Sequence, residues 1–187
     1  MKDISNYLFS ELSNEAQKVE EIFQKECAIW VNRKLTCKLM VLGEAPLTRK
    51  QFFYYKKTGK YLSFLKQYYV NSKKLKDDDF KEFLRVKGIM NLDIYQYPLP
   101  TNFYDNDKKS ILFDPAFISS QISDLTNMGI INTNTVYVYR YQKLIDRNLH
   151  QQLPFSSLSE LKHVISAPIA IGPNAANINP IMTQYLP

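Results

Sequence analysis

Hydrophobic positions at the start of the chain recur with a helical period. Apolar residues separated by three, four and seven positions, with Glu and Lys between them, predict a helical segment over about residues 1–34. Ser10 and Ser13 are candidate caps for a break into two helices. The apolar positions are Leu8, Leu12, Val19, Ile22 and Phe23.

Short apolar runs farther along the chain predict the strands of a buried sheet. The predicted strands cover residues 38–42, 89–94, 135–139 and 165–171. Helical spacing predicts helices at residues 61–69, 80–84, 115–125, 142–150 and from 157 onward, and residues 73–79 are expected to form a solvated connector. Asp114 as N-cap and Pro115 at the first helical position give one of these helices a clear start. The alternation predicts an α/β three-layer sandwich around a short, mostly parallel four-stranded sheet.

Length and composition narrow the class of protein. The 187 residues fit one domain, 1–187, with 45% hydrophobic and 22% charged residues. No apolar run reaches the ~20 residues of a membrane helix, and the N-terminus lacks the apolar core of a signal peptide. Cys27 and Cys37 form no CxxC pair, and with only two histidines the chain lacks the ligand spacing of a Cys/His zinc site. We therefore expect a cytoplasmic protein, a monomer by default, without membrane attachment, metal or cofactor.

Positive charge is concentrated in one stretch of the chain. The formal net charge is +6, and residues 48–76 hold nine Lys and Arg, eight aromatic residues and no acidic residue. Basic side chains interleaved with rings suit a phosphate backbone and stacked bases. The stretch predicts DNA, single- or double-stranded, as a partner. Rings at helical spacing are also typical of a core, and a run of lysines is also typical of a solvated face.

Two carboxylates fall where strands of the predicted sheet end. Glu44 follows the first strand and Asp93 ends the second. Parallel α/β sheets bind ligands beyond the carboxyl ends of their strands, and a buried carboxylate is costly without a partner. Both residues are therefore candidates for chemistry, although each is equally explained as a helix cap or as the partner of a lysine.

The segment Gly43-Glu44-Ala45-Pro46, directly after a hydrophobic strand, resembles the first motif of the uracil-DNA glycosylase superfamily. Residues 88–93 are similar to the second strand of that family, and residues 165–168, with Ser166, fall near its final loop. The resemblance implies a loop, 43–46, that surrounds the base and places the hydrolytic water. It also implies an aromatic ring that stacks on the flipped base, for which the candidates are Phe52, Phe53 and Tyr54.

Three positions depart from the pattern of that family. Leu47 replaces a glycine, Asp93 replaces the asparagine that reads the base, and Ile165 stands where a histidine is usual. A carboxylate only accepts hydrogen bonds, so Asp93 suits a base with more donors than uracil has.

The resemblance predicts hydrolysis of the N-glycosidic bond of a modified or deaminated base flipped out of DNA. Glu44 would orient water or stabilise the sugar cation, and Asp93 would hold the base. Phosphates would be bound by Arg49, Lys50, Lys56, Lys57 and Arg140. Two alternatives stay open: a non-catalytic nucleic-acid-binding module on the same fold, and an α/β domain that binds a small molecule or a protein.

Overall fold

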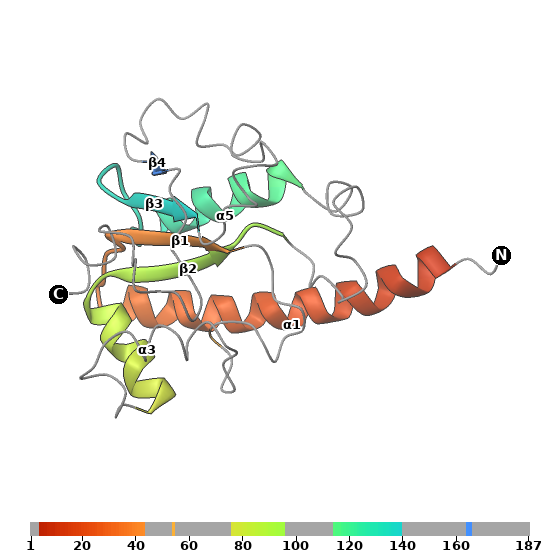
Figure 1. Ribbon diagram of the computed structural model, residues 1–187, viewed down its shortest axis with the longest axis horizontal. Helices are drawn as coiled ribbons and strands as arrows, with labels where there is room; N and C mark the ends of the chain where they lie inside the picture. The colour runs from red at the N-terminus through yellow and green to blue at the C-terminus, as the bar shows by residue number, and fades with distance from the viewer. Residues whose placement is uncertain (1–3, 44–53, 55–75, 96–113, 140–163, 166–187) are drawn as a thin grey trace, which may run out of the picture.

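The computed structural model describes residues 4–43, 54, 76–95, 114–139 and 164–165, and these form a mixed α/β arrangement (Figure 1). The helices are α1 (Ile4–Asn32), α3 (Asp77–Val86) and α5 (Pro115–Asn127), and the strands are β1 (Leu39–Gly43), β2 (Ile89–Asp93), β3 (Val136–Tyr139) and β4 (Val164–Ile165). The predicted α/β class is confirmed.

The strands form a small parallel sheet in the order β2-β1-β3-β4. β1 pairs with both neighbours in parallel, so that Gly43 lies beside Asp93 and Leu42 lies beside Tyr139. β4 adds two residues beside β3. The predicted strands at 38–42, 89–94 and 135–139 are confirmed, whereas residues 166–171 lie outside the described residues.

One face of the sheet packs against α1 and α5. Alternation along the strands brings Met40, Leu42, Met90, Leu92 and Tyr137 to this face, where all five are buried in one cluster. The same cluster includes side chains of both helices: Phe23, Cys27, Trp30, Ile118, Ile122 and Leu125. The predicted apolar face of α5 is confirmed, and that of α1 is confirmed at Phe23, with Val19 and Ile22 partly buried against the cluster; the side chains of Leu8 and Leu12 lie outside the described ones.

The other face of the sheet is buried as well. Leu39, Val41 and Val138 are fully inaccessible on it. The chain passes from β1 to β2 in one direction and from β2 to β3 in the other, so right-handed crossovers place α3 and α5 on opposite faces. In agreement, α3 contacts β2, and its Phe80 and Leu84 are buried outside the cluster formed with α1 and α5.

Two helix boundaries differ from the prediction. α1 is continuous through Ser10 and Ser13, because serine in a helix interior costs less than about 0.7 kcal/mol and its neighbours favour helix. The predicted connector 73–79 is also wrong at its end, since α3 begins at Asp77. Acidic residues in a first helical turn are stabilised by the helix dipole, so this aspartate run begins the helix.

The start of α5 is confirmed in detail. The Asp114 side chain accepts a hydrogen bond from the Ala116 amide at 2.9 Å, and Pro115 occupies the first helical position. The predicted helices at 61–69, 142–150 and from 157, including the Ser157–Glu160 capping box, lie outside the described residues.

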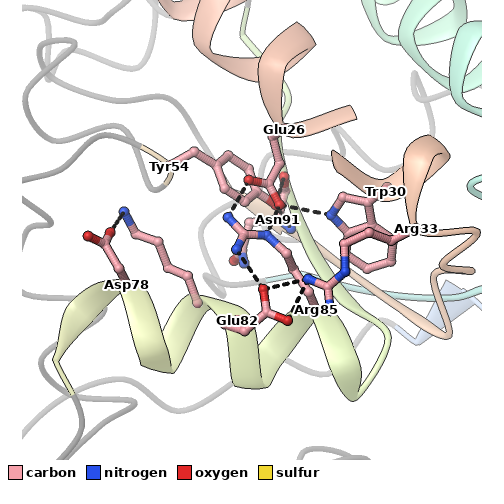
Figure 2. Close-up of polar contacts among 9 residues, drawn as sticks. Glu26, Trp30, Arg33, Tyr54, Asp78, Glu82, Arg85 and Asn91 are labelled. Carbon is pink, nitrogen blue, oxygen red and sulfur yellow. Dashed lines mark hydrogen bonds and ion pairs between the residues drawn. The ribbon is translucent and has the colours of Figure 1, made fainter. Parts of the chain in front are cut away.

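A buried ion pair joins α1 to α3 (Figure 2). The Arg85 guanidinium donates to both carboxylate oxygens of Glu26 at 2.6 and 2.7 Å, and the Trp30 indole donates to Glu26 at 2.8 Å. Glu26 is only 3% exposed. Arg85 also contacts Glu82, to which the exposed Arg33 donates at 2.6 Å. The hydrogen bonds from Arg33 and Arg85 lower the pKa of Glu82. This network joins α1 to the last turn of α3, which directly precedes β2.

Candidate functional site

The carboxyl ends of β1 and β2 meet at one edge of the sheet. Gly43 is the register partner of Asp93, and the Ile94 amide donates to the Gly43 carbonyl at 3.1 Å. Glu44 is bonded to Gly43, so its Cα lies about 3.8 Å from that of Gly43 by covalent geometry. The chain therefore leaves β1 at Gly43 beside Asp93, while Glu44 lies outside the described residues.

The strand order places a topological switch point at β1 and β3. The connection after β1 leads to β2 on one side, and the connection after β3 leads to β4 on the other. Open α/β sheets bind ligands at the carboxyl ends of such a pair. Gly43, the last residue of β1, and Tyr139, the last residue of β3, lie at that position.

Asn91 shares a strand face with Asp93. It is 5% exposed, and neither its side-chain oxygen nor its side-chain nitrogen has a hydrogen-bond partner among the described residues. Its register partner Val41 and the next residue across, Val138, are apolar. A buried amide without a partner costs about 1–3 kcal/mol. Asn91 therefore needs a hydrogen-bonding partner that the described residues do not supply, which makes it a candidate to contact a ligand.

The Tyr54 hydroxyl bonds to the backbone at the outer edge of β2 (Figure 2). Its hydroxyl accepts from the Asn91 amide at 2.7 Å and donates to the Asn91 carbonyl at 3.1 Å, as a further strand would. Its ring lies 6.1 Å from that of Phe23. Burial, with a smaller effect of Glu26, raises the pKa of Tyr54, so the hydroxyl keeps the proton that it donates.

A cavity of about 960 Å³ opens between α1, α5 and the end of β2. Its floor is largely apolar, with Val19, Phe23, Leu92 and Phe117 among its residues. The described charged residues around it are Glu20, Glu21, Lys25, Asp93 and Asp124. Four carboxylates against one lysine favour a neutral or cationic ligand and disfavour phosphate at this opening.

The candidate site residues fall into two groups. The structure places Gly43 and Asp93 together at the sheet edge. The Tyr54 hydroxyl bonds to the backbone of β2, and stacking of the Tyr54 ring on a base stays a prediction. The others lie outside the described residues: Glu44, Ala45, Pro46, Arg49, Lys50, Phe52, Phe53, Lys56, Lys57, Arg140 and Ser166.

Sequence reasoning missed Asn91 and the cavity. The signal for Asn91 was visible, because it is the polar residue inside the apolar run 89–92. The cavity had no such signal, since its carboxylates other than Asp93 come from two helices far apart in the chain and look like ordinary solvated positions.

The cysteines do not provide a nucleophile. Burial raises the pKa of Cys27 and that of Cys37 to about 12, so both thiols stay protonated. Among the described residues no group of three His, Cys, Asp or Glu is arranged to hold a metal ion. In the same part of the chain no helix has the length and apolar character needed to cross a membrane.

Comparisons of the chain with protein-family models, with curated proteins and with solved structures found no match.

Proposed function

We propose that the protein is a DNA glycosylase-like enzyme on a four-stranded uracil-DNA glycosylase-like fold, acting on a modified or deaminated base flipped out of DNA. The observation that carries the proposal is the register of Gly43 with Asp93. Gly43, the first residue of the Gly43–Pro46 motif, lies beside Asp93 at the edge of a parallel sheet where ligands bind.

The reaction is hydrolysis of an N-glycosidic bond. Water adds to C1′ of the sugar, the C1′–N bond breaks, and its electron pair leaves with the base, which takes up a proton. Glu44 orients the water or stabilises the positive charge that develops on the sugar. Asp93 accepts hydrogen bonds from the base. Phe52, Phe53 or Tyr54 stacks on the base, and the basic residues of the segment 49–57, with Arg140, bind phosphates.

A base-release assay tests the proposal. The protein is incubated with single- and double-stranded oligonucleotides that each carry one modified base, and abasic sites are revealed by alkaline cleavage. We expect release of at least one base, with a loss of about 100-fold or more in Glu44→Gln and in Asp93→Ala. Asp79→Asn is the control, because Asp79 is exposed on α3. Release of no base, or equal release by Glu44→Gln and the wild type, would overturn the enzymatic proposal.

The salt dependence of DNA binding tests the phosphate contacts separately. Replacing Arg49, Lys50, Lys56 and Lys57 by Glu should flatten the slope of log affinity against log salt by up to about 3–4, since each phosphate contact contributes about 0.9. An unchanged slope would remove this segment from the DNA interface. Binding without base release would instead support the non-catalytic nucleic-acid-binding module.

The cavity favours a second candidate function, the binding of a small molecule. Its volume of about 960 Å³ suits a ligand pocket, and its carboxylates disfavour phosphate. This candidate predicts binding of a neutral or cationic compound with no affinity for DNA. Retention on a DNA column that weakens with salt would exclude this candidate as the sole function.

A further inference from the structure

The side chain of Asn91, rather than its backbone, is the unsatisfied group at the edge of β2. The Asn91 amide and carbonyl are both bonded to the Tyr54 hydroxyl. The carboxamide, in contrast, has no hydrogen-bond partner among the described residues, although only 5% of the residue is exposed to water. Two hydrogen-bond donors and one acceptor group are thus held on a rigid strand without protein partners.

Next to the Asn91 carboxamide, the row at the end of the strands holds a carboxylate and a glycine. Asn91 and Asp93 lie on the same face, about 6.6 Å apart along the strand. Gly43 is the residue of β1 that lies directly opposite Asp93, and it has no side chain. Asp93 itself is partly exposed. The edge of a planar ligand that spans these two rows can contact Asp93 with one end and Asn91 with the other.

Apolar neighbours make a purely structural role for the carboxamide costly. Val41 and Val138 continue the row of Asn91 across the sheet, and Leu39 lies in the row before it. A leucine at position 91 would complete this apolar surface without an unsatisfied polar group.

We propose that Asn91 is a specificity-determining residue that, with Asp93, selects a base with a guanine-like edge. The Asp93 carboxylate accepts hydrogen bonds from the adjacent N1–H and 2-amino groups of the base. The side-chain nitrogen of Asn91 donates to O6. This inference rests on the proposed function for the location of the base. It adds the class of base, because one carboxylate and one amide complement two donors beside one acceptor.

Binding of three nucleosides tests the assignment without any hydrolysis. Guanosine has the complete edge, inosine lacks the 2-amino group, and 2-aminopurine riboside lacks O6 and N1–H. Titration calorimetry or ligand-observed NMR should show guanosine binding at least about tenfold more tightly than either analogue. Asn91→Leu should reduce the preference for guanosine over 2-aminopurine riboside to the part that the N1–H contact with Asp93 supplies. Asn91→Asp, which keeps the shape but replaces the donor with an acceptor, should reduce it at least as much.

Two controls separate the outcomes. Asn127→Ala removes an exposed asparagine at the end of α5 and should leave the order of affinities unchanged. The melting temperature of Asn91→Leu shows whether the variant folds, and it should equal or exceed that of the wild type. Unchanged nucleoside preference in a folded Asn91→Leu, or equal affinity of the wild type for all three nucleosides, would overturn the inference.

Base release distinguishes failure of this inference from failure of the proposed function. If oligonucleotide bases are released equally by the wild type and Asn91→Leu, the proposed function holds and the role of Asn91 is refuted. If no base is released but guanosine binding depends on Asn91, the specificity assignment holds and hydrolysis is refuted.

Discussion

Removal of the Arg85 charge should destabilise the protein far more than removal of the Arg33 charge. Both guanidinium groups contact Glu82, but only Arg85 pairs with the buried Glu26 (Figure 2). Arg85→Met leaves the Glu26 carboxylate, 3% exposed, with the Trp30 indole as its remaining hydrogen-bond donor among the described residues. Arg33→Met breaks a contact whose side chains are 42% and 39% exposed.

The magnitudes follow from this difference in burial. Breaking a buried pair by removing one partner costs about 3–5 kcal/mol. The retained Trp30 hydrogen bond and the 15% exposure of the Arg85 side chain place the expected loss near the lower limit, about 3 kcal/mol. For a chain of this length that loss lowers the melting temperature by about 6–12 °C. An exposed pair contributes at most about 1 kcal/mol, so Arg33→Met should lower it by less than about 4 °C.

Urea unfolding and thermal melts of the two variants at pH 7 provide the measurement. The double variant Glu26→Gln/Arg85→Met should recover part of the loss, because no buried charge is then left without a counter-ion. Equal stability of Arg85→Met and Arg33→Met would refute the reasoning. So would a double variant less stable than Arg85→Met alone.

Three further predictions concern other elements. Tyr54→Phe should lower the free energy of unfolding by about 1–3 kcal/mol in urea titrations, because it leaves the Asn91 amide and carbonyl without the hydroxyl; wild-type stability would contradict the edge role. Gly88→Ala should destabilise more than Gly129→Ala: both φ angles are positive, +76° and +71°, but only at Gly88 would a Cβ meet atoms of Lys38 and Thr36, at 2.9 and 3.0 Å. Cys27 and Cys37 should resist a thiol reagent at pH 8 until urea is added. The pKa of each thiol is about 12 in the folded state and about 8.5 in the unfolded state, so the unfolded state loses these protons first. The free energy of unfolding should therefore fall as pH rises above about 9. Fast labelling of the folded protein would contradict the burial of the thiols.

The sequence alone determined the elements whose signals are local. The apolar run before Gly43 predicted β1, and the cap at Asp114 with Pro115 predicted the start of α5, because capping and strand burial depend on neighbouring residues. The α/β class followed from the order of these elements. The start of α3 was missed, since a run of aspartates is typical both of a connector and of a helix N-terminus.

The tertiary structure alone decided which residues meet. Gly43 and Asp93 are neighbours through strand register, and Glu26 meets Arg85 across 59 positions of the chain. The Tyr54 hydroxyl closes the edge of β2 and leaves the Asn91 carboxamide as the unsatisfied group. Neither pattern nor propensity encodes such pairings, because periodicity gives the face on which a side chain lies but not the side chain opposite it.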